Sequence, residues 1–384
     1  MDYRAEIPYG CYWSTPFARW QGAFANLHSV EFAAQVTKAE LQRRNIAPDT
    51  FDHGVLGLSV PQKHSFYGLP WLAGMAGLGH VAGPTVMQAC ATGVRALLAG
   101  TQEIQLGLAQ ASLTVTCDRT SNGPHLYYPN PKGPGGTGTH EDWVMDNFSC
   151  DPLGPHAMIR TAENVAKKHG ISTAEQHEVV LMREAQYRKA VGDFQARFFA
   201  EAPIKADEGI RTSTPEKLAQ LKPVMEGGTV TYGAQTYPAD GNAAIVLASS
   251  EVAKKLSKDR EIRIRLLGFG QSRAELAYMP EAPIAAAGRA LDQAGLKPRD
   301  MKAVKTHNPF AANDVLFSRA TGVPLEKMNN FGCSLVWGHP QAPMGTRSVI
   351  ELVEELAAAG GGYGLFTGCA AGDSAMAVVL SVGK

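Results

Sequence analysis

The sequence predicts an α/β fold built from two similar halves. Segments with apolar side chains at helical spacing alternate along the chain with short apolar segments that are typical of strands. The same alternation recurs after residue 258, which indicates an internal duplication. The chain of 384 residues also exceeds the size that a single hydrophobic core usually reaches. Together these observations favour two α/β units, with residues 1–258 and 259–384 as their bounds.

The first half shows the alternation most clearly around Cys90. An apolar, strand-like segment ends before this cysteine, and helical spacing begins after it. Between residues 118 and 240 the character changes to Gly-rich turns and polar helices, so we expect an excursion from the core. The expected elements are helices at 24–45, from Ala91 and at 173–191, and strands at 55–60, 84–88 and 111–117.

The second half repeats this order after a charged helix and linker at residues 251–261. The glycines at 360–362 suit the termination of its last helix. The expected elements are strands at 262–269 and 303–306, helices at 284–294, from Ala312 and at 346–358, and two adjacent core strands in YGLFTGCA and AMAVVLSV.

Composition excludes several classes of protein. The chain has 36 basic and 36 acidic side chains, so no net charge attracts it to nucleic acid or to an anionic membrane. Its apolar runs are too short to cross a membrane, and its N-terminus lacks a secretion signal, so we expect a cytoplasmic protein. Six cysteines without a CxxC pair make a metal site unexpected.

Cys90 in the segment QACATG is the first candidate for chemistry. Unpaired amides and the positive end of a helix dipole favour a thiolate there, which predicts a pKa below that of free cysteine. The small neighbours Ala89, Ala91 and Gly93 leave room for an acyl group. The alternative is a cysteine that only packs between strand and helix.

Three further candidates follow in the second half. His339 lies between Gly338 and Pro340 in a loop before a helix, where it could take a proton or donate to an oxyanion. Cys369 ends an apolar strand beside a turn of small residues, and His307 lies just beyond another strand. For each of the three, a solvated or purely structural side chain is the alternative.

The order and context of these motifs resemble the thiolase superfamily. MQACATG resembles the thiolase nucleophile motif, WGHPQAPMG the Gly-His-Pro loop, and TGCAAG the C-terminal cysteine turn. The resemblance spans nearly the whole chain. It implies two duplicated α/β half-domains in a five-layered α-β-α-β-α arrangement, with a loop domain inserted at about 118–240.

The resemblance also implies roles. Cys90 would carry the acyl group, His339 would activate it, and Cys369 would move the α-carbon proton of the second thioester. The backbone amides of Cys90 and Ala371 would form an oxyanion hole. A Claisen condensation needs such an acyl carrier, a separate base and two sets of oxyanion donors. Coenzyme A would be a substrate, and no metal or redox cofactor is expected.

Departures from the common thiolase pattern concern the substrate. His307 stands where many thiolases have asparagine, as in the branch of sterol-carrier-protein-linked and archaeal thiolases, and could donate to an oxyanion directly or through water. Gln341 and the residues after it replace the usual loop, which favours a bulky, branched or aromatic acyl group. Thr236 and Arg211 lie where thiolases contact coenzyme A, although a turn hydroxyl and a solvated charge are the alternatives. Residues 129–138 are interpreted as a flexible cap segment, not a phosphate-binding loop.

Two other functions stay open at the level of sequence. A ketoacyl-synthase-like condensing enzyme would share the fold but normally has one active cysteine, so Cys369 favours a thiolase. A catalytically silent acyl-CoA-binding subunit would not need two cysteines and two histidines. The resemblance further implies a homodimer or a dimer of dimers, and in the histidine-bearing branch a zinc-ribbon and oligonucleotide-fold accessory protein.

Overall fold

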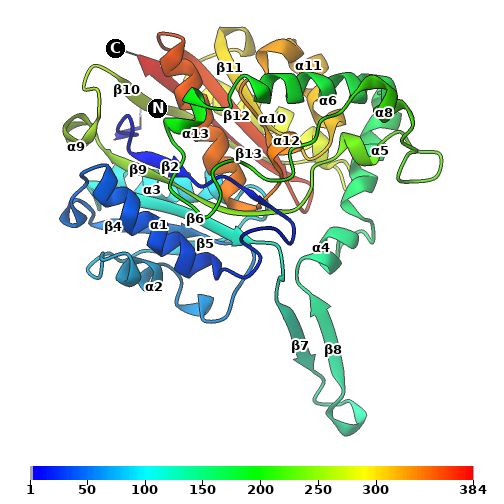
Figure 1. Cartoon of the computed structure of the whole chain (residues 1–384), viewed down its shortest axis with the longest axis horizontal. Coiled ribbons are helices and arrows are strands. Elements are labelled where there is room, and N and C mark those ends of the chain that lie inside the picture. Colours follow the sequence, from blue (N-terminus) through cyan, green and yellow to red (C-terminus); the bar gives the residue numbers. More distant parts are fainter. Residues whose placement is uncertain (1–2, 384) are drawn as a thin grey trace.

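The computed structural model describes residues 3–383, which form an α/β protein (Figure 1). Within this range no helix has the length and apolar character needed to cross a membrane. The strands are β1 (Ala5–Glu6), β2 (Tyr12–Ser14), β3 (Ala18–Arg19), β4 (His53–Gly57), β5 (Thr85–Val86), β6 (Ala111–Arg119), β7 (His125–Pro129), β8 (Gly138–Asp142), β9 (Ala239–Ser249), β10 (Arg263–Arg273), β11 (Met301–His307), β12 (Gly362–Ala370) and β13 (Ser374–Gly383).

The helices alternate with these strands in both halves. They are α1 (Ser29–Arg43), α2 (Gly68–Met75), α3 (Thr92–Gln105), α4 (Met145–Ser149), α5 (Met158–His169), α6 (Thr173–Arg188), α7 (Asp193–Ala196), α8 (Pro215–Ala219), α9 (Ser250–Leu256), α10 (Ala282–Ala294), α11 (Ala311–Thr321), α12 (Ser334–Trp337) and α13 (Ala342–Ala358).

The strand pairing repeats from one half to the other. In the first half, β4 is parallel to β5 and β6, and β6 is antiparallel to β9. In the second half, β11 is parallel to β12 and to an isolated bridge at Met328, and β12 is antiparallel to β13. The short strand β1 pairs with both β9 and β10 and joins the two sets into one hydrogen-bonded path. The pairing order therefore shows the duplication predicted from the sequence.

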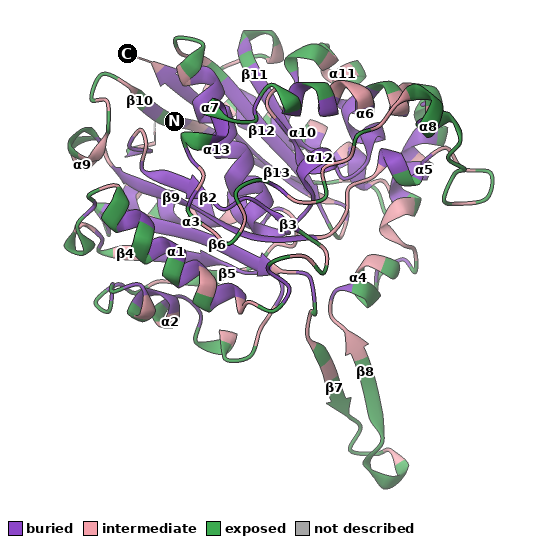
Figure 2. Ribbon diagram, in the orientation of Figure 1, coloured by how far each residue is buried: buried purple, intermediate pink, exposed green. Residues whose placement is uncertain are grey.

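Alternating side chains on the strands separate the layers. On β9, Ala243, Ile245 and Leu247 face the central core with α3 and α13, whereas Ala244 and Val246 face the core under α1 and α2. On the other sheet, β13 divides its side chains in the same way between the central core and a third core under α10 and α11. Three cores between outer helices, two sets of strands and two central helices give the predicted five layers (Figures 1 and 2).

The two central helices touch through a glycine. A Cβ on Gly93 of α3 would lie 2.7 Å from the carbonyl oxygen of Ala342 and 2.7 Å from the backbone nitrogen of Thr346 in α13. Real Cβ contacts are not that short, so only glycine allows this approach. The close approach brings the N-termini of α3 and α13, and the residues just before them, to one place.

The inserted region differs from the sequence prediction at its tip. Residues 129–138, interpreted as a flexible cap, form the end of the β7–β8 hairpin, which projects from the body and is largely exposed (Figures 1 and 2). The segment PNPKGPGGTG has turn chemistry, and the flanking residues pair antiparallel from His125↔Asp142 to Pro129↔Gly138. The cap over the site comes instead from the base of the hairpin and from α4.

Several element ends also differ. The helix predicted at 24–45 begins at Ser29, because residues 20–28 form turns with Phe24 buried among them. The strand predicted at 84–88 pairs only at Thr85–Val86, since the chain must turn there to start α3. The last helix begins at Ala342, four residues earlier than predicted, with Pro343 in its first turn, where a missing N–H costs nothing.

Candidate active site

The four predicted catalytic side chains converge on one cavity of about 780 Å³. Each comes from a strand end or from the segment just before a central helix, so both halves contribute. Apolar side chains from the inserted region form much of the remaining wall. The lining includes Cys90, His307, His339, Gln341, Cys369 and Ala371, together with Met87, Trp143, Val144, Met145, Phe148, Met158, Ile159, Met279 and Phe310.

Cys90 lies at the turn that leads into α3. Ala89 adopts a left-handed conformation with φ of 44°, and Thr92 fixes the turn because its hydroxyl donates to the Ala89 carbonyl at 2.7 Å. Burial raises the pKa of the Cys90 thiol to about 12, although the backbone amides of Ala371 and Cys90 oppose the shift. The sequence-based prediction of a lowered pKa is therefore wrong for the resting site, because desolvation outweighs the helix N-terminus.

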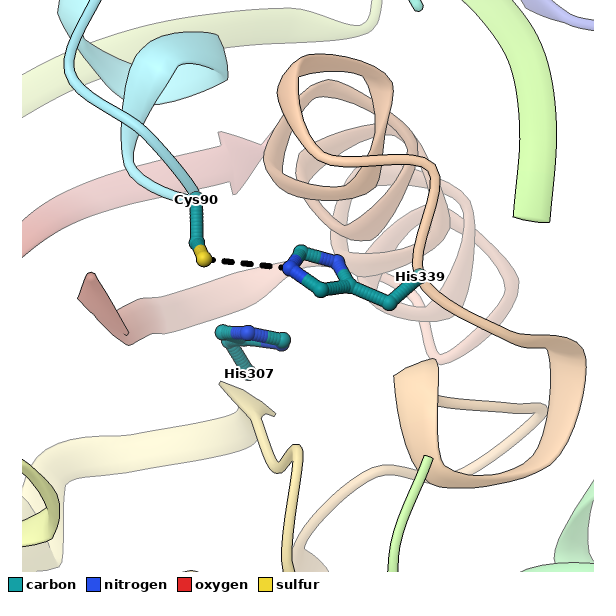
Figure 3. Close-up of side chains that lie close together, drawn as sticks. All are labelled: Cys90, His307 and His339. Carbon is teal, nitrogen blue, oxygen red and sulfur yellow. Dashed lines mark hydrogen bonds between the residues drawn. The ribbon is translucent and has the colours of Figure 1, made fainter. Parts of the chain in front are cut away.

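His339 provides the group nearest to the sulfur. Its Nε2 lies 3.1 Å from Cys90 Sγ (Figure 3), and its backbone N–H donates to the Tyr237 carbonyl at 2.8 Å. Burial lowers the pKa of His339 to about 3, so the imidazole is neutral at pH 7. Thiol and imidazole thus form a neutral pair at rest. The proton passes from Cys90 to His339 only when a bound substrate reacts with the thiolate.

His307 stands beside His339 at the end of β11. The two ring centroids are 4.3 Å apart (Figure 3), and the Nδ1 of His307 lies 2.8 Å from Ser334 Oγ. Burial, and then the neighbouring His339, lower the pKa of His307 well below its ordinary value. Its Nε2 is buried without a hydrogen-bond partner among the described residues. A buried, unsatisfied ring nitrogen beside a thiol suits a group that meets its partner only in the substrate.

A buried polar network holds His307 from behind. Asn308 Oδ1 lies 3.1 Å from the Ser334 hydroxyl, the Asn308 amide donates to Asp314 at 2.8 Å, and Arg183 donates to the same carboxylate at 2.8 Å. Arg183 and Asp314 are both fully buried, so their pairing compensates two desolvated charges. Sequence reasoning missed this network, since its members lie far apart along the chain.

Cys369 and Ala371 occupy the turn after β12. Asn313 of α11 donates to Cys369 Sγ at 3.4 Å, and burial raises the pKa of this thiol well above its ordinary value, with the nearby Cys90 adding to the shift. The Ala371 amide faces Cys90, as its effect on the thiol shows. The second cysteine and the predicted oxyanion amides therefore lie around the first cysteine.

The two predicted coenzyme A contacts behave differently. Thr236 lines the cavity, where its hydroxyl donates to the Ser334 carbonyl at 2.5 Å. Arg211 is absent from the cavity wall and donates to the carbonyls of Tyr232, Gly233 and Gln235. Its guanidinium holds a turn of the protein, which is a structural use of the charge.

Among residues 3–383, two clusters have the donor atoms for a metal ion. Ligand atoms of Cys90, His307 and His339 lie within 4.8 Å of one another, as do those of Asp151, His156 and Asp373. A sulfur and two imidazoles would suit zinc. The same three groups suit acyl transfer, and the sequence-based expectation of no metal stays a prediction.

Comparisons with known proteins agree with this geometry. The family descriptions "Thiolase, N-terminal domain" and "Thiolase, C-terminal domain" match residues 13–251 and 261–382. The human mitochondrial 3-ketoacyl-CoA thiolase is 29% identical over 389 residues, with 95% of this chain and 96% of the relative covered. The acetyl-CoA acetyltransferase of Escherichia coli is 28% identical over 387 residues, with the same coverage.

Solved structures give the same result. The crystal structure of human mitochondrial 3-ketoacyl-CoA thiolase in complex with CoA superposes with a TM-score of 0.90 at 27% identity and covers 99% of each chain. The Bacillus anthracis acetyl-CoA acetyltransferase also gives 0.90, at 26% identity with 99% of each chain covered. Fold and site thus define an acyltransferase with a thiolase fold. This chain belongs to the thiolase family.

Proposed function

We propose that this enzyme cleaves a β-ketoacyl-CoA with coenzyme A, or runs the reverse Claisen condensation, through an acyl-Cys90 intermediate. The observation that carries the proposal is the 3.1 Å approach of His339 Nε2 to Cys90 Sγ, with Cys369 on the same cavity wall. One thiol next to a neutral base can take the acyl group, while the second thiol remains free for the proton at carbon.

Cleavage then proceeds in two balanced steps. Cys90 gives its proton to His339 and attacks the β-keto carbon, the bond between the α and β carbons breaks, and Cys369 protonates the α carbon of the released acetyl-CoA. Coenzyme A next gives its thiol proton to the Cys369 thiolate and attacks the acyl-Cys90 thioester, and Cys90 leaves and recovers its proton from His339. Raised thiol pKa values suit this chemistry, because Cys369 must hold a proton until a carbanion needs it.

Two groups of donors are available for the developing oxyanions. We assign the unpartnered Nε2 of His307 to one of them, in the tautomer in which Nε2 carries the proton and the Ser334 hydroxyl donates to Nδ1, and the amides of Cys90 and Ala371 to the other. Direct donation by His307 supports the histidine-bearing branch, which itself stays a prediction. Donors that are fixed before the reaction stabilise charge without reorganising.

The cavity wall favours a bulky, uncharged acyl group. The side chains that reach it from the inserted region and from the second half are mostly methionine and aromatic or branched residues, among them Trp143, Phe148, Met158, Met279 and Phe310. Glu141 is the one charged side chain in the lining, so a second carboxylate on the acyl chain would meet no counter-charge. Branched or aromatic β-ketoacyl groups fit this wall better than acetoacetyl.

The chain also has surfaces for self-association. Strand β5 ends the hydrogen-bonded path of the sheet, and nearby Phe66 and Tyr67 are 95% and 68% exposed. An unpaired edge beside large apolar side chains supports a homodimer, and the projecting β7–β8 hairpin supports pairing of dimers. Cytoplasmic location and an accessory protein stay predictions.

The test is thiolysis of a panel of β-ketoacyl-CoA esters by the pure protein with free coenzyme A. We expect cleavage of branched or aromatic esters at kcat/KM about tenfold or more above acetoacetyl-CoA, because each buried apolar group adds binding energy. Preference for acetoacetyl-CoA would contradict the substrate class. A requirement for a malonyl donor would favour a ketoacyl-synthase-like enzyme. No reaction, and no acylation of Cys90, would favour a silent subunit.

A further inference from the structure

The nucleophile has a third neighbour that the thiolase pattern does not supply. Gln341 Oε1 lies 3.4 Å from Cys90 Sγ, and His339 Nε2 lies 3.1 Å from the same sulfur. Gln341 is 6% exposed and lines the cavity. Among residues 3–383 its side chain forms no other hydrogen bond, so its amide N–H groups are available to donate to Cys90 Sγ.

The backbone of Gln341 is held in an unfavourable conformation. Its φ of 62° and ψ of −109° belong to a region where glycine is normally found. A glutamine there is strained, and such strain persists where the side chain has a use. A Gln341→Gly change would relieve the backbone strain at this position. The sequence nevertheless has a glutamine there, just before α13 and beside Cys90.

A carboxamide suits both protonation states of the cysteine. Its oxygen can accept from the thiol when the S–H points away from His339, and its NH₂ group can donate to the thiolate once the proton has passed to His339 and the amide has turned over. The two orientations are nearly equal in shape, so the turn needs little space. A neutral donor also adds no charge to a site where burial disfavours ions.

We propose that Gln341 is a further catalytic residue, which turns its amide to donate a hydrogen bond to Cys90 when the thiol proton passes to His339. The thiolate then has His339, Gln341 and the backbone amides around it, and no other proton moves. This inference rests on the proposed role of Cys90 as nucleophile.

Three substitutions separate hydrogen bonding from shape. Gln341→Met keeps the length but removes both amide functions, Gln341→Glu keeps the shape but offers only acceptors, and Gln341→Gly removes side chain and strain together. The readout is the rate of iodoacetamide modification of Cys90 at pH 8, from peptide mass analysis, alongside the melting temperature. Because a hydrogen bond to a charged group is stronger than a neutral one, we expect about a tenfold loss for the methionine variant and a larger loss for the glutamate variant.

The glycine variant is the matched control for strain. We expect it to melt at a higher temperature than wild type while its Cys90 reacts about tenfold more slowly, which no purely structural role of Gln341 would produce. Equal alkylation rates in wild type and the methionine and glutamate variants would overturn the inference. Acylation of wild-type Cys90 by a β-ketoacyl-CoA is measured in parallel, and its absence would overturn the proposed function while the alkylation order still tests Gln341.

Discussion

The two halves of the chain share one scaffold and place different side chains at its corresponding points. Cys90 precedes α3, and His339 occupies the matching place before α13. Because Gly93 lets the two helices approach closely, the two matching points meet, and nucleophile and base face each other. The duplicated fold thus places two corresponding segments next to each other, and the different residues in them, Cys90 and His339, provide a nucleophile and a base.

The strand ends differ in the same way. At the end of β6, Asp118 accepts from the backbone nitrogens of Ser59, Val60 and Ala342 at 2.9, 2.7 and 2.9 Å. The matching strand β12 carries Cys369 instead. The first half therefore uses its strand end to fasten loops around the site, whereas the second half uses its strand end for a reactive thiol.

The largest effect should come from removing the groups that differ most between the halves. Cys90→Ser should lower kcat/KM for thiolysis by about 10⁴-fold or more, because no covalent intermediate can form efficiently. Cys369→Ala should lower it by about 10³-fold through loss of proton transfer at carbon, yet a saturated acyl-CoA should still acylate Cys90, because thioester exchange moves no proton at carbon. Steady-state thiolysis combined with single-turnover acylation separates the two variants. Equal loss of acylation in both would contradict the division of labour.

A smaller effect should follow from the second half's oxyanion donor. His307→Ala should reduce kcat by about 10²-fold with little change in KM, since the unpartnered Nε2 meets its partner only as charge develops. Ser334→Ala tests whether the contact with Nδ1 positions the ring, and we expect it to reduce kcat less. A change confined to KM in His307→Ala would show that the ring only binds substrate.

The contact between the central helices requires a glycine on α3 but not on α13. Gly93→Ala should lower the free energy of unfolding by about 1–3 kcal/mol, because its Cβ would collide with the backbone of α13. Gly345→Ala on α13 is the matched control, since its Cβ would meet neighbours only at 3.6 Å or more. That variant should gain about 0.5–1 kcal/mol from helix propensity. Urea unfolding of both measures the asymmetry, and similar destabilisation would contradict it.

The smallest expected effect is on how the melting temperature depends on pH. His339 is neutral in the folded protein with a pKa of about 3, whereas an unfolded histidine takes up a proton near pH 6.5. The stability associated with its neutral state is present above pH 6.5 and is lost as pH falls toward 3. His339→Gln should therefore lose less melting temperature than wild type between pH 7 and pH 4. His125→Gln, on the exposed hairpin, controls for the loss of a histidine, and parallel curves for wild type and His339→Gln would refute the assignment.

Much of the fold could be predicted, because period-two and helical spacing mark the strands and helices of both halves. The residues Cys90, His307, His339 and Cys369 could also be selected, since local motifs surround each one. The hairpin and the exact contact of Gln341 could not, because they depend on long-range packing. The prediction of a lowered pKa for the Cys90 thiol was wrong for the same reason. The position at a helix N-terminus can be recognised from local sequence, whereas the burial that raises the pKa depends on the whole fold. The bounds 1–258 and 259–384 stay a prediction.

The most direct test of the central claim is intact-protein mass analysis of Cys369→Ala after brief incubation with a saturated acyl-CoA, which transfers its acyl group by thioester exchange alone, followed by peptide mapping. The account predicts one added acyl group, located on Cys90, which disappears when coenzyme A is supplied. An unmodified variant under conditions where the same acyl-CoA acylates wild type, or an acyl group on any cysteine other than Cys90, would contradict it.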